Sequence, residues 1–154
     1  MTSEKKQEFT LRITQANKSE LVVILYDMFQ AYLEDAEQAE GEEFHNAISH
    51  ARAVLNELIE SLDMKYEIAK NLYQIYRYVE RLLIQADVRL DKEPLKEVSS
   101  HISPLRDAYN TVSKEDASPS VMENTEVVYA GMTYGKTDLN ENNAGGASKR
   151  GFLA

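Results

Sequence analysis

The 154-residue sequence contains no cysteine, which excludes disulfide bonds, thiolate metal sites and cysteine nucleophiles. It also lacks any run of about 18 apolar residues, so no transmembrane helix is predicted. The polar start of the chain has no apolar stretch of the kind found in signal peptides. The length corresponds to one ordinary domain, and we expect that domain to fold in the cytoplasm.

Positive charge is scarce as well. The chain has 17 Lys and Arg against 26 Asp and Glu, which gives a formal net charge of −9. Proteins that bind nucleic acid or an anionic membrane surface neutralise phosphates with clustered Lys and Arg. Because this sequence has no such cluster, we expect neither nucleic acid nor a membrane as a partner.

Glycine is nearly absent from most of the chain. Residues 1–115 contain only Gly41, whereas the other five glycines follow residue 130. Glycine marks turns and loops and weakens helices. We therefore expect a helical domain over residues 1–115 and a largely non-helical, partly flexible C-terminal extension over residues 116–154.

Four amphipathic helices are predicted from apolar periodicity and end signals. The first begins at Asn17, which can form a capping box with Glu20, and it ends before Gly41. Its apolar residues spread over about half of the helix circumference, more than one seam requires. This helix should therefore be covered on two sides. The short links between the four helices predict an all-α, antiparallel four-helix bundle.

The other three predicted helices extend over about 42–62, over about 66–90 and onward from Pro94. Pro104 lies inside the last one, where we expect a kink or a break because proline cannot donate a helical hydrogen bond. The expected core residues are Phe44, Ile48, Ala51, Leu55, Leu58 and Leu62 in the first of these helices, Ile68, Leu72, Ile75, Val79, Leu82 and Ala86 in the next, and Leu95, Val98, Ile102, Leu105 and Tyr109 in the last.

One pattern of metal ligands deserves comparison with known sites. Glu42-x-x-His45 matches one of the two Glu-x-x-His motifs of carboxylate-bridged di-iron bundles, which also use two further buried glutamates. Such a site needs a second copy, and neither His50 nor His101 follows a glutamate by three residues. No signature of a hydrolase, a phosphate loop or a dinucleotide-binding turn occurs either. We therefore expect no metal ion, no cofactor and no catalysis, with a carboxylate-metal enzyme as the alternative that metal analysis would test.

The helix predicted over residues 66–90 is rich in tyrosine. On a helical wheel Tyr66 and Tyr73 fall roughly opposite the apolar face, near Arg77. Tyrosine and arginine outside a core are typical of protein interfaces. The alternative is that these rings pack on loops or on the C-terminal extension.

Three segments carry a family resemblance. They are residues 16–27 (ANKSELVVILYD), residues 61–86 (SLDMKYEIAKNLYQIYRYVERLLIQA) and residues 105–109 (LRDAY). They are similar, in order and spacing, to motifs of the flagellin-export chaperone family FliS. The resemblance covers about residues 9–114.

The resemblance implies a cytoplasmic, non-catalytic type III export chaperone. Such a protein holds the C-terminal segment of flagellin, prevents premature polymerisation and supports delivery to the flagellar export gate, whose component FlhA is a further candidate partner. The alternative is a helical regulator or adaptor that keeps the fold and binds another flagellar export component or an anti-sigma factor.

The resemblance also implies a flagellin-binding groove and an N-terminal arm over residues 1–16 that gates it. The alternation of apolar residues in this arm predicts an extended strip lying on the helices. The groove residues are Leu25, Tyr26, Ile68, Asn71, Leu72, Tyr73 and Tyr76, and the gating residues are Phe9, Leu11 and Ile13.

The C-terminal extension contains a segment, residues 127–135, that is too apolar for a solvated linker and too rich in glycine for a helix. We predict that it is a second cover over the groove. The alternative is a structural strap at a site that flagellin does not use. The covering residues are Val128, Tyr129, Met132 and Tyr134.

Overall fold

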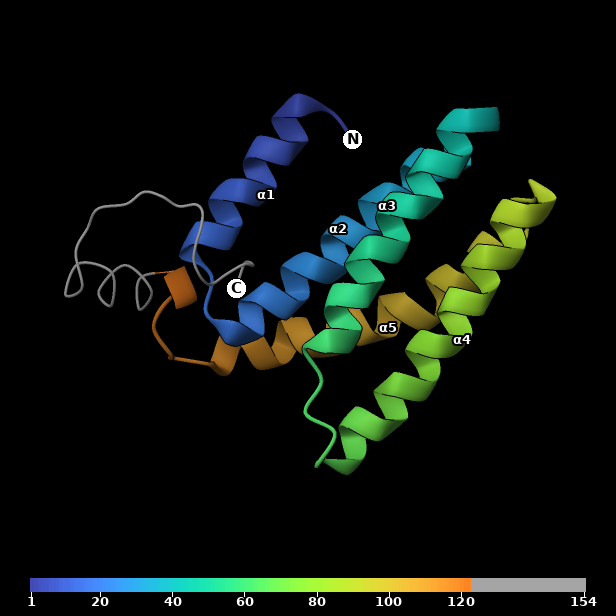
Figure 1. Ribbon diagram of the computed structural model, residues 1–154. Coiled ribbons are helices and arrows are strands. Elements are labelled where there is room, and N and C mark those ends of the chain that lie inside the picture. Colours follow the sequence, from blue (N-terminus) through green and yellow to red (C-terminus); the bar gives the residue numbers. More distant parts are fainter. Residues whose placement is uncertain (123–154) are drawn as a thin grey trace, which may run out of the picture.

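The computed structural model describes residues 1–122, which form α-helices and no strand (Figure 1). The helices are α1 (Ser3–Gln15), α2 (Lys18–Gln38), α3 (Gly41–Glu60), α4 (Glu67–Arg89) and α5 (Pro94–Glu115). The prediction of an all-helical protein is confirmed for these residues. The four predicted helices correspond to α2 to α5, and α1 is an addition.

The N-terminal arm is a helix, so the prediction of an extended strip is wrong. Thr2 caps α1, since its side chain accepts a hydrogen bond from the Lys5 backbone N–H. In a helix, residues two apart point to different sides, whereas residues four apart share a face. Phe9 is accordingly buried and Ile13 half-buried, whereas Leu11 is 58% exposed. Alternation is typical of a strand, but the spacing of four residues between Phe9 and Ile13 also fits one face of a helix.

The predicted capping box at the start of α2 is confirmed. The Asn17 side chain accepts from the Glu20 N–H, and the Glu20 carboxylate accepts from the Asn17 N–H, both at 2.9 Å. The helix ends slightly earlier than expected, and Gly41 begins α3 instead of following α2 directly. Gly41 has a φ of +57°, a conformation that costs glycine little.

Four helices enclose the main core. α2 packs against α3 and α5, and α4 also packs against α3 and α5, so these four form a ring of contacts. α1 packs against α2 and lies outside this ring (Figure 1). The antiparallel order of a four-helix bundle stays a prediction.

Most of the predicted core residues are buried, and α5 is continuous through Pro104. The break considered at Pro104 is therefore absent. Ile68 is the exception among the core predictions, because it is 64% exposed. It lies in the first turn of α4, which projects past the end of α3 in Figure 1. The largest fully buried side chains are Tyr26, Tyr76, Phe29, Phe44, Ile48, Leu55, Leu58, Leu83, Leu95, Ile102, Val79 and Val98.

A pair of tyrosines joins α2 to α4 inside this core. The hydroxyl groups of Tyr26 and Tyr76 form a hydrogen bond, and the Tyr109 ring lies 5.7 Å from the Tyr26 ring. Burial raises the pKa of Tyr76 to about 12, and burial raises the pKa of Tyr26 further. Both hydroxyls are therefore neutral at ordinary pH, and the hydrogen bond gives each a polar partner inside the core.

We expect Tyr26→Phe to lower the free energy of unfolding by about 1–3 kcal/mol, because it leaves the buried Tyr76 hydroxyl without its partner. The double variant Tyr26→Phe/Tyr76→Phe removes both hydroxyls and keeps both rings. The decrease in the free energy of unfolding should be smaller for the double variant than the sum of the decreases for the two single variants. Urea unfolding of the four proteins measures this coupling, and strictly additive losses would contradict it.

Candidate functional site

α1 covers an apolar face of α2 that the main core does not use. At about 100° per residue, the α2 residues in this face lie roughly opposite those in the core. We call this contact between α1 and α2 the cover contact. It agrees with the expectation that α2 is covered on two sides. Its buried residues are Phe9, Ala16, Ile24 and Ala31, with Met1, Ile13, Leu21 and Met28 partly buried against them.

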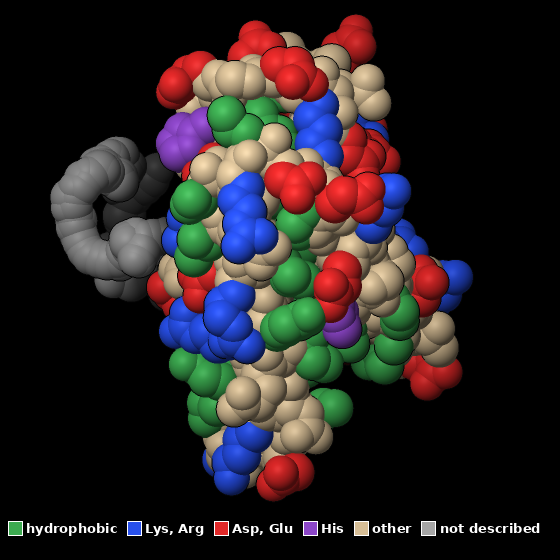
Figure 2. Space-filling model, turned by 90° about the vertical axis from the view of Figure 1, so that its right-hand side faces the viewer, with side chains coloured by type: hydrophobic (Ala, Val, Ile, Leu, Met, Phe, Trp, Pro, Cys, Tyr) green, Lys and Arg blue, Asp and Glu red, His purple; other side chains and the backbone are tan. Residues whose placement is uncertain are grey.

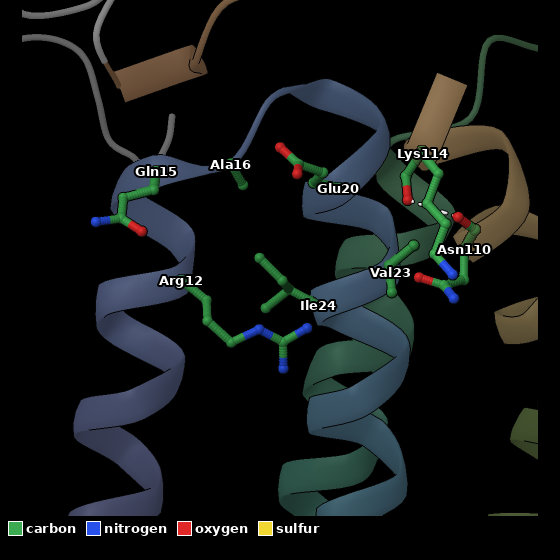
Figure 3. A pocket seen from close by; sticks show the side chains of 9 residues that line it. Arg12, Gln15, Ala16, Glu20, Val23, Ile24, Asn110 and Lys114 are labelled. Carbon is green, nitrogen blue, oxygen red and sulfur yellow. Dashed lines mark hydrogen bonds between the residues drawn. The ribbon is translucent and has the colours of Figure 1, made fainter. Parts of the chain in front are cut away.

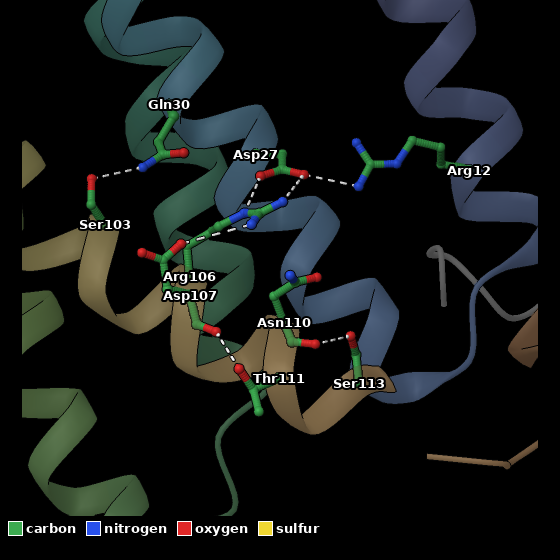
Figure 4. A network of polar contacts seen from close by, with 9 residues as sticks. All are labelled: Arg12, Asp27, Gln30, Ser103, Arg106, Asp107, Asn110, Thr111 and Ser113. Carbon is green, nitrogen blue, oxygen red and sulfur yellow. Dashed lines mark hydrogen bonds and ion pairs between the residues drawn. The ribbon is translucent and has the colours of Figure 1, made fainter. Parts of the chain in front are cut away.

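An ion-pair network holds α1 at the middle of this contact. Asp27 accepts from Arg12 Nη2 at 2.8 Å and from Arg106 Nε at 2.8 Å, so it joins α1, α2 and α5 (Figure 4). Burial alone would raise the pKa of Asp27, but hydrogen bonds and charges from Arg106 and Arg12 outweigh it and lower the pKa. The Arg12 guanidinium also lies 5.6 Å from the centre of the Phe9 ring.

Open cavities flank α1 on both sides of Arg12. One of about 360 Å³ lies near the end of α1, where Arg12 and Ile24 face each other across the gap (Figure 3). The other, of about 200 Å³, is lined by Phe9, Ala31 and the Asp27 carboxylate among others. α1 therefore fills the space beside α2 only in part. Charged and polar residues also line both cavities, so the open space beside α2 has a mixed polar and apolar lining, which suits an amphipathic segment.

The structure separates the predicted groove residues into two groups. Tyr26, Leu72 and Tyr76 are buried in the main core in this conformation, and their assignment to the flagellin-binding groove stays a prediction. Leu25 is half-buried against the same core. These positions therefore support the fold of the described helices.

The remaining groove residues lie on the surface of α4. Ile68 and Asn71 are exposed and Tyr73 is half-buried, with its hydroxyl accepting from Arg77 Nε at 3.0 Å. α4 packs on α3 and α5, on the other side of the ring from α1 (Figure 1). The structure therefore does not join these residues to Phe9 and the cover contact.

Among the gating residues, Phe9 and Ile13 lie in the cover contact, whereas Leu11 does not. Sequence reasoning missed Arg12 and Asp27 entirely. The spacing of Phe9, Arg12 and Ile13 within one helical turn was the available signal for Arg12. The predicted tail cover (Val128, Tyr129, Met132 and Tyr134) lies outside the described residues and stays a prediction.

The histidine weighed as a metal ligand has a different partner. His45 Nδ1 lies 2.9 Å from both carboxylate oxygens of Asp87, and this hydrogen bond raises the pKa of His45. Within residues 1–122, no three His, Asp or Glu side chains are grouped so that they could hold a metal ion. None of the described helices has the length and apolar character needed to cross a membrane.

Hydrophobic side chains also reach the surface on and beside α4. Figure 2 views the molecule from the side on which α4 lies in Figure 1, and its hydrophobic groups are interspersed with charged ones. The exposed large hydrophobic residues in this region are Met64, Tyr66, Ile68, Ile84, Val88 and Leu90.

The chain resembles known flagellar proteins over the whole helical region. The sequence model of the family described as flagellar protein FliS matches residues 1–116. The flagellar secretion chaperone FliS of Bacillus subtilis (strain 168) is 27% identical over 101 residues, which cover 63% of this chain and 76% of the relative. The flagellar secretion chaperone FliS of Salmonella typhimurium (strain LT2) is 30% identical over 111 residues, which cover 66% and 80%.

We expect Arg12→Met to loosen α1 and leave the ring of helices intact. Loss of a partly exposed ion pair costs about 0.2–1 kcal/mol, so the α1 amides should exchange their hydrogens up to about fivefold faster. Lys6→Met removes the same charge from an exposed position on the same helix and should have no such effect. Hydrogen exchange followed by mass spectrometry compares the two variants.

The effect of Arg12→Met on hydrogen exchange in α1 should also depend on pH. The pKa of Asp27 is lowered from 3.8, so its ion pair with Arg12 stabilises the packing of α1 on α2 above that pH. This contribution is lost as the pH falls through the lowered pKa and the carboxylate becomes neutral. The difference between Arg12→Met and the parent protein should therefore vanish in acid. A difference that persists there would contradict the assignment of the ion pair as its source.

Proposed function

This chain belongs to the FliS family of flagellar proteins, and from this membership we propose that it is an export chaperone for flagellin. It holds the C-terminal segment of flagellin, prevents premature polymerisation and supports delivery to the flagellar export gate. It acts by binding and release and performs no chemical reaction on its client. The observation that carries the proposal is the second apolar face of α2, which is separate from the main core and covered only by α1 among the packed helices.

The client takes the place of α1. An amphipathic segment such as an unpolymerised flagellin terminus can bury one apolar face as a helix in a groove. When α1 moves away, Ile24 and Ala31 offer that groove from α2. The free segment is disordered, so binding must also order it. This ordering costs a few kcal/mol of the gross interaction energy, which keeps the complex releasable.

α1 is suited to be a movable cover. Phe9 is its one buried side chain, so its contact is small beside the main core. The link to α2 is short and extended, with Ala16 at φ −81°, ψ 139° and Asn17 at φ −80°, ψ −178°. Rotation about this link moves α1 without disturbing the capping box. Elements with few buried contacts open at a lower free energy than the rest of a fold.

The surface of α4 favours a second, adaptor role. Tyr66 is 56% exposed and Val88 is 78% exposed, and the Arg77 guanidinium lies 5.1 Å from the centre of the Tyr73 ring. Exposed aromatic and apolar side chains with an arginine are typical of protein interfaces. We infer that this surface contacts a flagellar export component, for which FlhA is the candidate. The groove under α1 and the α4 surface would then serve different partners.

We expect a flagellin C-terminal peptide to bind the full chain with one-to-one stoichiometry and a negative heat-capacity change, the mark of apolar burial. Phe9→Ala removes the buried anchor of the cover and should raise the apparent affinity about tenfold, which corresponds to about 1.4 kcal/mol. Leu11→Ala truncates an exposed residue of the same helix and should leave the affinity unchanged. Calorimetric titration at two temperatures measures all three proteins.

Two outcomes would count against the proposal in different ways. If Phe9→Ala and Leu11→Ala bind the peptide equally well, α1 is not the cover of the site. If no variant binds it, the chain serves a different client, and the adaptor role becomes the better description.

A further inference from the structure

The chain after α5 folds back across the junction between α1 and α2. We call residues 116–121 the C-terminal clasp. The Asn17 side chain donates to the Asp116 carbonyl at 3.2 Å and to the Ser118 carbonyl at 3.4 Å. The Ser19 hydroxyl donates to the Asp116 carboxylate at 2.6 Å. The clasp is therefore fastened to the first turn of α2.

Two more hydrogen bonds fasten the clasp to α1. The Ser120 hydroxyl donates to the Thr14 carbonyl at 3.1 Å, and the Val121 N–H donates to the Ala16 carbonyl at 2.9 Å. The last carbonyls of a helix have no partner inside the helix and need one from elsewhere. The clasp supplies such donors at the end of α1, where a movement of this helix has to begin.

Asn17 connects the clasp to the link on which α1 turns. Its side-chain oxygen and its backbone N–H are used in the capping box with Glu20, and its side-chain nitrogen is used by the clasp. Asn17 is 5% exposed, so these partners replace water. Hydrogen bonds from Ser118 and Ser19 lower the pKa of Asp116 to about 2, which keeps this carboxylate charged.

We propose that the C-terminal clasp locks α1 in its closed position, so that the clasp must release before α1 can uncover α2. The consequence for client binding rests on the proposed function. The clasp bonds both sides of the α1–α2 link at once, and α1 cannot swing away while its last carbonyls and the first turn of α2 share one partner segment. The family match ends at residue 116, so most of the clasp lies beyond the matched region, whereas its partners on α1 and α2 lie within it.

The lock also gives the C-terminal extension a role. The rest of the C-terminal extension, up to residue 154, follows the clasp directly in the sequence. A partner that binds the extension and draws it away removes the donors at Thr14 and Ala16 together. Access to the groove is then set by two segments at opposite ends of the sequence.

The test uses the full chain with Asp116→Ala, which removes the carboxylate that Ser19 and Ser118 contact. The matched control is Glu115→Ala, because Glu115 is exposed and its side chain makes no hydrogen bond or ion pair within residues 1–122. Hydrogen exchange of α1 should be at least about threefold faster in Asp116→Ala and unchanged in the control. Exchange in α3 and α4 should stay the same in both.

A second variant separates the lock from a local effect on the end of α5. Ser19→Ala removes the partner on α2 and leaves the clasp intact. It should accelerate α1 exchange as well, and Ser19→Ala/Asp116→Ala should add little to the larger single effect. Independent, additive effects would overturn the lock, as would unchanged α1 exchange or an equal increase in α3.

The flagellin peptide distinguishes failure of the lock from failure of the proposed function. Faster α1 exchange together with tighter peptide binding in Asp116→Ala supports both. Faster exchange with unchanged binding supports the lock and places the client elsewhere. Unchanged exchange overturns the lock, whatever the peptide does.

Discussion

The structure depends on one helix that is apolar on two nearly opposite sides. One side of α2 supplies Tyr26, Phe29 and Leu33 to the main core, and the other presents Ile24 and Ala31. A helix of this kind cannot leave its second side in water without cost, because exposed apolar surface is unfavourable. The ring of α2 to α5 therefore needs a fifth element. α1 supplies it within the chain, and under the proposed function a client segment takes its place.

Periodicity predicts those elements whose pattern admits one interpretation. The core positions of α3 recur at helical spacing, and the capping box at Asn17 and Glu20 fixes the start of α2. The prediction for the arm was wrong because Phe9 and Ile13, four residues apart, fit one face of a helix as well as a strand, and only contact with α2 decides between them. The prediction that Ile68 is a core residue was wrong because periodicity assigns a face of the helix but does not say where the neighbouring helices end.

The candidate site was less predictable than the fold, for two physical reasons. Motif resemblance led to Tyr26, Leu72 and Tyr76, which are buried in the core. The polar contacts that position α1 join residues far apart in sequence. Asp27 meets Arg106, 79 residues away, and Asn17 meets Asp116, 99 residues away. No local pattern marks such pairs, since their proximity results from the packing of several helices.

The restraints on α1 differ in chemistry, and this sets how the cover can be released. Burial of Phe9 contributes about 1.5–3 kcal/mol at most, and the partly exposed Arg12–Asp27 pair adds less. These two contacts thus favour the closed state only modestly, and under the proposed function a client with several apolar anchors displaces a cover that has one fully buried side chain. The clasp acts at the link instead of the groove, so a client does not compete with it directly. Under the proposed function, such a chaperone has a low apparent affinity for its client when the clasp is mostly closed and a higher one when it is mostly released, with the groove itself unchanged.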